Sequence, residues 1–403
     1  MKRFAIITLA SSLFLTPSFG AKDFDNPIPF DTWKKSFKNR AIDQGISQNT
    51  LNRAFANVTR NPSVIGYDRH QPEFSRTFGQ YIGSALSETR VSRAREMYKQ
   101  HKPMLDNISA KYGVAPHYLV AFWGLETNFG RHTGKMDIIR SLATLSHDLR
   151  RSDFFEKELI LALKIIQNGH AVRKTFLGSW AGAFGQTQFM PSTFTAYAVD
   201  GDGDGKKDLL NSKLDIFSSS ANFLSRVGWR RGEHWGREVK ISTSDFDWQQ
   251  SGNKVKKTLT EWSDLGVTDI DGNTLDKSFN GKVRLVLPAG ASGPKFLVYT
   301  NFRKILVWNR SDFYALGVGL LANKILNLPD MSWKPKKGEK SLSRKDFMSI
   351  QKFLHDKGFY TSAIDGVFGS GSRQALKSYQ KSSGLITDGH ADSQMLKHIK
   401  GVK

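Results

Sequence analysis

The sequence predicts a mainly α-helical protein with a small β-containing insert and a small C-terminal binding domain of three helices. Apolar residues recur at helical spacing through most of residues 30–328. Short alternating runs interrupt this pattern between residues 238 and 299. A linker rich in proline and lysine, residues 329–341, separates the C-terminal segment 342–403. A chain of 403 residues is long enough for two or three such domains.

The helical part shows its periodicity most clearly in four segments. One of them, Pro116 to Gly130, is apolar nearly all round, which is typical of a central helix. Proline suits its first turn and glycine its C-terminal end. The other three predicted helices are residues 91–112, 153–166 and 312–326. In the insert, residues 282–287 and 296–299 alternate in polarity and predict short strands.

The C-terminal segment contains a half-repeat. Ile364-Asp-Gly-Val-Phe-Gly and Gly384-Leu-Ile-Thr-Asp-Gly are each followed by a helical pattern. From Lys334 onward the chain has 14 basic and 6 acidic residues. A small, basic, repeat-built segment is typical of a binding module, so we do not expect it to carry the catalytic group.

Composition excludes several classes of protein. The chain has 59 Lys plus Arg, 37 Asp plus Glu, a net charge of +22 and no cysteine. With 39% hydrophobic and 12% aromatic residues it can bury a core, which excludes wholesale disorder. The absence of cysteine excludes a disulfide scaffold, a thiolate metal site, a cysteine nucleophile and lipid attachment to cysteine. The charge predicts an acidic partner: nucleic acid, an anionic membrane surface or a carboxylate-rich polymer.

Residues 1–20 predict a cleaved signal peptide. Basic Lys2 and Arg3 precede an apolar stretch from Phe4 to Leu15, and small residues lead to a cleavage site after Gly20. The alternative, an uncleaved membrane helix, is disfavoured because 12 residues do not span a hydrocarbon layer of about 30 Å. We therefore expect export. An exported chain does not meet chromosomal DNA, so the sequence predicts no nucleic-acid partner.

Glu126 is the only acid in the apolar segment 116–130. Leu119, Phe122 and Trp123 share its helical face, because these positions are three, four and seven residues apart. An apolar surrounding raises the pKa of a carboxyl group, which can then donate a proton to a glycosidic oxygen. The alternative is a buried glutamate paired with Arg or Lys for structure, and the helix alone does not favour the catalytic interpretation.

Residues 178–192 form a glycine-rich loop that mixes polar and aromatic side chains. Ser179, Gln186 and Gln188 supply neutral hydrogen-bonding groups. Aromatic neighbours such as Phe189 supply flat apolar surfaces, and this mixture suits a sugar. A phosphate cradle is excluded because no Gly-Lys-Ser/Thr follows. The alternative is a tight connection between helices.

Residues 200–215 resemble a calcium loop of the EF-hand type. Asp200, Asp202 and Asp204 occupy positions 1, 3 and 5, and the carbonyl oxygen of Lys206 would occupy position 7. Asn211 stands at position 12, where a bidentate Glu is expected, so Asp215 is the candidate that closes a longer loop. The sequence predicts a structural Ca²⁺ and no organic cofactor. The alternative is a solvated acidic turn.

The order and spacing of these motifs resemble the B-type lytic murein transglycosylases. The motifs are Gly124-Leu-Glu-Thr-Asn-Phe-Gly, Gly178-Ser-Trp-Ala-Gly-Ala-Phe-Gly, Gln188-Phe-Met-Pro-Ser, Tyr197-Ala-Val-Asp with its aspartates, and Trp308-Asn-Arg-Ser-Asp-Phe-Tyr. The resemblance implies a lysozyme-like α catalytic domain, placed at residues 21–328. The Asp-Gly repeats make residues 342–403 similar to a peptidoglycan-binding domain. Because lipid-anchored members need a cysteine, the chain is expected to be periplasmic without a lipid anchor.

The resemblance also implies roles for individual residues. Glu126 matches the family's single catalytic acid. Trp308 stands where the family often has Tyr, so stacking survives while a hydroxyl is lost. The positions implied to bind substrate are Ser179, Gln188, Phe189, Tyr81, Trp308, Asn309 and Tyr314. The positions implied to bind calcium are Asp200, Asp202, Asp204, Lys206 and Asp215.

The activity implied is cleavage of the MurNAc–GlcNAc β-1,4 bond of peptidoglycan glycan strands without water, giving 1,6-anhydro-MurNAc ends. Hydrolysis would need a second carboxylate about 5–9.5 Å from the first, and the Glu126 helix has none. Two alternatives remain: a muramidase that hydrolyses the same bond, and a non-catalytic calcium-dependent wall-binding protein. The sequence identifies no protein partner in cell-wall synthesis or division.

Overall fold

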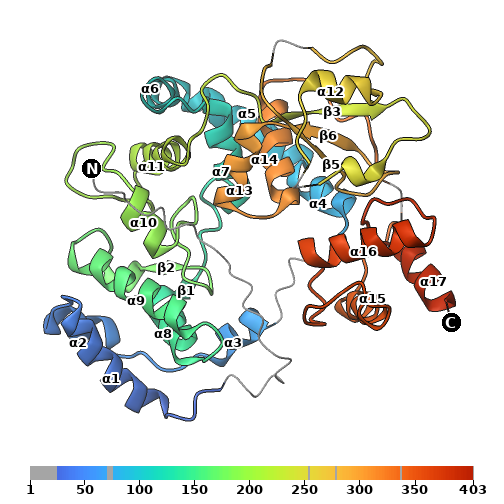
Figure 1. Cartoon of the computed structure of the whole chain (residues 1–403). Coiled ribbons are helices and arrows are strands. Elements are labelled where there is room, and N and C mark those ends of the chain that lie inside the picture. The colour runs from blue at the N-terminus through green and yellow to red at the C-terminus, as the bar shows by residue number, and fades with distance from the viewer. Residues whose placement is uncertain (1–24, 70–75, 253–254, 277–278, 336–337, 403) are drawn as a thin grey trace, which may run out of the picture.

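The computed structural model describes residues 25–69, 76–252, 255–276, 279–335 and 338–402. The predicted signal peptide at residues 1–20 therefore lies outside the described residues. Three separate hydrophobic clusters hold the described part together, one in the large helical region, one in the β-containing insert and one in the C-terminal segment. Figure 1 shows the insert and the C-terminal helices on the same side of the molecule, opposite the first helices.

Helices dominate the large region, as predicted. They are α1 (Phe30–Asp43), α2 (Gln48–Phe55), α3 (Pro62–Arg69), α4 (Phe78–Ala85), α5 (Glu88–Gln100), α6 (Lys102–Tyr112), α7 (Pro116–Thr127), α8 (Ile138–His147), α9 (Ser152–Gln167), a 3₁₀ turn η2 (Arg173–Thr175), α10 (Pro191–Tyr197) and α11 (Lys213–Arg226). A short antiparallel ribbon joins β1 (Met136–Asp137) to β2 (Leu177–Gly178). The ribbon fixes the start of the glycine-rich loop beside the start of α8.

The insert forms an antiparallel sheet with strand order β4-β3-β6-β5. Its elements are β3 (Gly236–Ile241), a 3₁₀ turn η3 (Trp248–Gln250), α12 (Leu259–Asp264), β4 (Val267–Thr268), β5 (Arg284–Val286) and β6 (Lys295–Val298). Trp262, Leu285 and Leu297 are fully buried in its own core. The alternating runs predicted from the sequence correspond to β5 and β6.

Two helices return the chain to the centre of the large region. These are α13 (Thr300–Trp308) and α14 (Asp312–Ile325). In Figure 1 they lie with α7 between the insert and the N-terminal helices, and α14 packs along α7. On α7, Leu119 and Phe122 have no exposed surface. The apolar segment predicted as a central helix is therefore central.

The C-terminal segment contains α15 (Arg344–Asp356), α16 (Ser370–Ser382) and α17 (Ser393–Gly401). Its two half-repeats are built alike. The Nε2 group of Gln351 donates to Asp365 at 3.1 Å, and the Nε2 group of Gln380 donates to Asp388 at 3.0 Å. The second repeat also reaches the insert, because the amide of Ala291 donates to the other oxygen of Asp388 at 2.9 Å.

Two predicted helices differ from the structure at their ends. Residues 91–112 form two helices, because Pro103 lacks the amide hydrogen that a continuous helix needs and so occupies the first turn of α6. The helix beginning at Pro116 ends at Thr127, three residues before Gly130, because Asn128 and Phe129 adopt left-handed conformations with φ of 49° and 60°. Helices α9 and α14 match the predicted segments to within one residue at each end.

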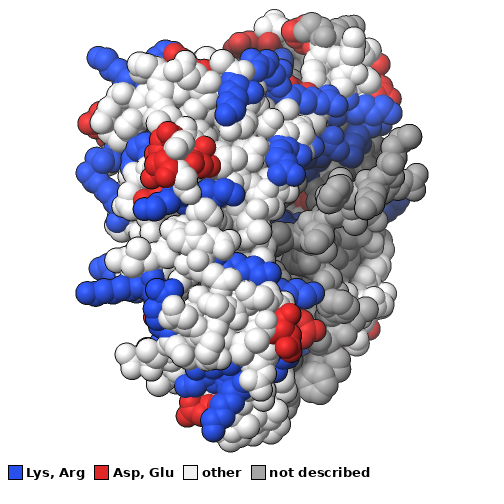
Figure 2. All heavy atoms as spheres, turned by 90° about the vertical axis from the view of Figure 1, so that its left-hand side faces the viewer, with Lys and Arg blue, Asp and Glu red and all other residues white. Residues whose placement is uncertain are grey.

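Basic side chains are spread over the surface. Figure 2 shows one face of the molecule, on which blue Lys and Arg side chains are scattered among white ones and several small red acidic groups interrupt them. The positive charge of this face is therefore distributed over it. Among the described residues, no helix combines the length and apolar character that crossing a bilayer requires.

We expect two glycines inside helices to respond oppositely to replacement by alanine. A Cβ atom on Gly319 of α14 would lie 2.3 Å from the ring of buried Trp235, whereas a Cβ on exposed Gly83 of α4 meets nothing within 4 Å. Gly83→Ala should stabilise the fold by about 0.5–1 kcal/mol. Gly319→Ala should destabilise it by about 1–3 kcal/mol, since the core must move. Urea unfolding followed by circular dichroism measures both, and a Gly319→Ala protein as stable as the unmodified chain would contradict the packing described.

Candidate active site

Glu126 lies in the last turn of α7 and accepts hydrogen bonds from two distant parts of the chain. The indole Nε1 of Trp308, the last residue of α13, donates to Glu126 Oε1 at 2.9 Å. The hydroxyl of Tyr314, in the first turn of α14, donates to the same oxygen. Three residues named from the sequence thus meet at one carboxylate. Two donors on one oxygen fix the direction of that carboxylate.

An aromatic box orients Trp308. Its ring centroid lies 4.5 Å from that of Phe122, 5.3 Å from that of Phe189 and 5.0 Å from that of Phe223. Such contacts restrict the indole to one orientation, with its N–H directed at Glu126. The family resemblance predicts that aromatic stacking survives at this position and that a hydroxyl is lost. The structure shows instead that the indole N–H is a hydrogen-bond donor to Glu126.

Tyr314 is 7% exposed, and burial raises its pKa well above the ordinary value because the phenolate form is poorly solvated. The nearby carboxylate of Glu126 raises the pKa further, since two negative charges repel. The hydroxyl therefore stays protonated and remains a donor at neutral pH. Burial and the carboxylate together keep this hydrogen bond in place.

A cleft of about 2280 Å³ opens beside Tyr314, and the described residues that line it do not include Glu126. Tyr81, Asn309 and Tyr314 line it from the catalytic side, and residues of the insert and of α16 line it from the other sides. Asn309 is exposed, and its Oδ1 accepts from the amide of Ser311 at 3.1 Å. The structure therefore places Tyr81 and Asn309 in one cleft with a partner of Glu126. Their roles toward a substrate remain predictions.

Hydrogen bonds between side chains and the backbone fix the glycine-rich loop. The Oγ of Ser179 accepts from the amide of Ala183 at 3.0 Å, which closes a tight turn. Gln188 adopts a left-handed conformation with φ of 51°, and its Nε2 donates to the carbonyls of Thr133 and Gly185 at 3.0 and 2.9 Å. Both side chains are half-buried. Their contacts with a glycan remain predictions, but each holds one defined position.

Two residues of this loop differ from expectation. Phe189 is 2% exposed and packs against Trp308, so it supports the indole and does not offer a surface to a glycan. Gln186 is 7% exposed. Its side-chain Oε1 accepts from the indole of Trp123, and its Nε2 donates to the carbonyl of Leu210. The sequence predicted both as sugar contacts because the same residue types serve sugar binding and internal packing.

The sequence prediction missed Glu158 on α9. It is 3% exposed, and its Oε2 accepts from the amide of Ser192 at 2.9 Å. Burial raises its pKa. The bond holds the start of α10, which begins two residues after Phe189. An acid on the apolar face of an amphipathic helix indicates a buried hydrogen-bond partner, but sequence alone does not show which group that partner is.

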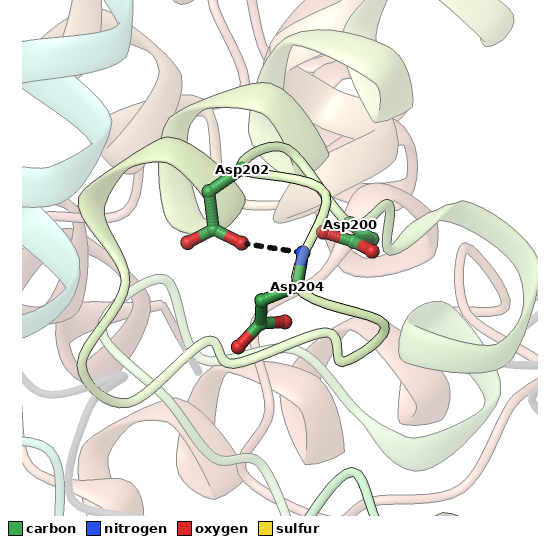
Figure 3. A group of neighbouring side chains, drawn as sticks. All are labelled: Asp200, Asp202 and Asp204. Carbon is green, nitrogen blue, oxygen red and sulfur yellow. Dashed lines mark hydrogen bonds between the residues drawn. The ribbon is translucent and has the colours of Figure 1, made fainter.

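Three carboxylates of the acidic loop converge. Oxygen atoms of Asp200, Asp202 and Asp204 lie within 4.8 Å of one another, and Figure 3 shows them around one turn. The amide of Gly205 donates to Asp200 at 2.8 Å and is the main cause of a lowered pKa for that carboxyl. Several exposed carboxylates at this separation repel one another, and hard oxygen ligands suit Ca²⁺. The donor set therefore fits a calcium ion.

The other predicted ligands are placed differently. Asp215 is fully buried, and its two oxygens accept from the amides of Gly201 and Asp208 at 2.7 and 2.6 Å. It braces both ends of the loop and does not belong to the three-carboxylate group. Lys206 donates its amide to Asp204 at 2.8 Å. Metal binding by the Lys206 carbonyl and by Asp215 stays a prediction.

Comparison with known proteins identifies the family of this domain. A family model described as Transglycosylase SLT domain matches residues 29–323, and one described as Putative peptidoglycan binding domain matches residues 343–399. SltB3 from Pseudomonas aeruginosa, solved in complex with NAG-anhNAM-pentapeptide, is 40% identical with a TM-score of 0.88, covering 92% of this chain and 99% of that one.

The chain belongs to the B-type lytic transglycosylase family. Membrane-bound lytic murein transglycosylase B of Escherichia coli is 30% identical over 61% of this chain; the match spans 66% of that protein, slightly under two thirds. The E. coli lytic transglycosylase Slt35, solved in complex with calcium, is 26% identical with a TM-score of 0.65, covering 76% of this chain and 95% of that one. The predicted family and the lysozyme-like, mainly α fold are confirmed.

In this B-type transglycosylase, we expect Trp308→Phe to slow turnover while the fold is retained. Phenylalanine keeps the aromatic packing but removes the N–H that donates to Glu126 Oε1. A hydrogen bond to a charged group contributes about 1.5–3 kcal/mol, so kcat should fall by roughly 10- to 100-fold. The matched control is Trp262→Phe, which removes an indole bond to the Val283 carbonyl in the insert. Equal kcat values for the two variants would contradict the assigned contact.

Proposed function

We propose that the chain is a peptidoglycan lytic transglycosylase that cleaves the MurNAc–GlcNAc β-1,4 bond without water. The observation that carries this proposal is the placement of Glu126 at the end of an apolar helix, under two donors of which Tyr314 lines a cleft, in a domain of the transglycosylase family. The complex of the relative SltB3 with NAG-anhNAM-pentapeptide supports the anhydro product. The 1,6-anhydro-MurNAc ends would form during cell-wall turnover.

Glu126 would act twice in this reaction. As an acid it donates its proton to the glycosidic oxygen, and the bond from that oxygen to C1 of MurNAc breaks. As a carboxylate it then takes the proton of the C6 hydroxyl, while O6 forms a bond to C1. The proton count balances and no water is consumed. The donors Trp308 and Tyr314 hold the carboxyl group in one direction during both halves of the reaction.

The surroundings of the reaction are also proposals. The C-terminal segment 342–403 would hold the enzyme on peptidoglycan, whose peptide stems carry carboxylates that a basic module attracts. The basic and apolar leader of residues 1–20 supports export to the periplasm. A Ca²⁺ ion held by Asp200, Asp202 and Asp204 would stabilise the loop without taking part in the chemistry. The calcium complex of the relative Slt35 supports this assignment.

We expect Glu126→Gln to abolish product release without unfolding the protein. Glutamine cannot donate or accept the transferred proton, and such a group contributes roughly 10²- to 10⁴-fold to the rate. The measurement is mass spectrometry of the products released from purified sacculi, with Glu88→Gln, an exposed acid on α5, as control. Products lighter by one water than hydrolysis products indicate a transglycosylase, and the heavier products would indicate a muramidase. Full activity of Glu126→Gln would contradict the assigned role.

Calcium should raise the melting temperature of the full-length protein, and a chelator should lower it, because the ion binds only the folded loop. At a free concentration of 100 times Kd the gain is about 2.7 kcal/mol. Asp202→Asn should remove this response. The control Asp269→Asn changes a second acidic turn, where Asp269 accepts from the amides of Asp271 and Asn273, and should keep the response. A melting temperature independent of Ca²⁺ would exclude the site.

A further inference from the structure

Hydrogen bonds made by one buried residue, Gln186, join the acidic loop to the catalytic helix. The Nε2 of Gln186 donates to the carbonyl of Leu210 at 2.6 Å, and its backbone amide donates to the carbonyl of Leu209 at 2.8 Å. Leu209 and Leu210 directly follow the acidic turn. On its other side, Gln186 Oε1 accepts from the indole of Trp123 at 2.9 Å, and its carbonyl accepts from Thr127 Oγ1 at 2.6 Å. Both partners belong to α7.

These two partners flank Glu126. Trp123 lies one turn before Glu126 and Thr127 directly after it. The hydroxyl of Thr127 also accepts from the amide of Gly130 at 3.0 Å, which closes the turn that follows the helix. There is no free space at this turn, since a Cβ atom on Gly130 would lie 2.3 Å from Gln186 Oε1. A shift of Gln186 must therefore be accompanied by a shift of the turn that carries Glu126.

A second connection, from the same C-terminal end of the acidic loop, reaches the same indole. Ser212, the N-cap of α11, donates its hydroxyl to Asp202 at 2.6 Å. The next residue, Lys213, places its Nζ 5.5 Å from the ring centroid of Trp123, and Phe217 of the same helix packs edge-on against Trp123 at 5.1 Å. The C-terminal end of the acidic loop therefore contacts α7 in two ways, through the hydrogen bonds of Gln186 and through the cation and the aromatic ring of α11.

We infer that Gln186 is a positioning residue that couples cation binding in the acidic loop to the turn carrying Glu126. The inference rests on the proposed calcium site. An ion that draws Asp200, Asp202 and Asp204 together orders the chain that leads into Leu209 and Leu210. Gln186 is 7% exposed, and it is hydrogen-bonded both to Leu210 and to Trp123 and Thr127. Ordering of Leu209 and Leu210 therefore restricts the positions of Trp123 and Thr127 as well. Coupling of two sites is reciprocal, so an ordered active site also favours the bound ion.

The test is hydrogen exchange of the full-length protein with and without Ca²⁺, read by mass spectrometry. In the unmodified chain, Ca²⁺ should slow exchange in residues 200–211 and, by roughly fivefold or more, in residues 124–134. In Gln186→Met, which keeps the chain length but removes both polar atoms, the effect should persist in residues 200–211 and vanish in residues 124–134. Gln351→Met, a buried amide of the C-terminal segment, is the matched control and should behave like the unmodified chain.

Kinetics provide a second measurement. If Gln186 positions Glu126, Gln186→Met should lower kcat with little change in KM, and kcat should no longer depend on Ca²⁺. Trp123→Phe, which removes the indole donor to Gln186 and keeps a smaller aromatic ring, should show the same separation and serves if the methionine variant does not fold. A calcium response of residues 124–134 that survives in both variants would overturn the inference.

Failure of this inference is distinguishable from failure of the proposed reaction. If Ca²⁺ slows exchange only in residues 200–211 of the unmodified chain, the coupling is overturned and the calcium site stays in place. An absence of Ca²⁺ binding in calorimetry would overturn both the site and the coupling. Neither result affects the role of Glu126, which the product masses test separately.

Discussion

The convergence of Trp308 and Tyr314 on one oxygen of Glu126 is the interaction on which the site depends. A carboxylate on an apolar helix is costly to bury unless donors reach it. Here the donors lie 182 and 188 residues further along the chain. The site therefore requires the ends of α13 and α14 to lie beside the end of α7. The packing of α14 along α7 in the core thus also places a donor on the catalytic group.

Local patterns were sufficient to predict the elements and the acidic loop. Helices α9 and α14 follow from apolar spacing within a single stretch of sequence, and the converging carboxylates of Asp200, Asp202 and Asp204 come from alternate positions of one turn. Glu126 was found because it is the only acid in an apolar segment. In each case the residues that carry the sequence pattern are the same residues that form the element, or lie within a few positions of it.

The errors concern directions of side chains that depend on distant partners. Phe189 and Gln186 have residue types that suit a sugar, but the structure uses one to support Trp308 and the other to join α7 to the acidic loop. The donation by Trp308 escaped prediction for the same reason: an indole is recognisable from the sequence as an aromatic surface, whereas the target of its N–H depends on packing. Pro103 indicates locally that a new helix begins, but the prediction for residues 91–112 followed their apolar periodicity and treated them as one helix.

The C-terminal half-repeats show how a small difference decides the placement of a domain. Asp365 and Asp388 make the same bond to a glutamine within their own repeats, which fixes the local fold. Only Asp388 also accepts from Ala291 of the insert, whereas within the described residues Asp365 bonds to the tail alone. The nearby Lys377 adds bonds to Ser251 at 2.8 and 2.9 Å. Because these contacts place α16 along the cleft that Tyr314 lines, the binding module and a hydrogen-bond partner of Glu126 face the same cleft.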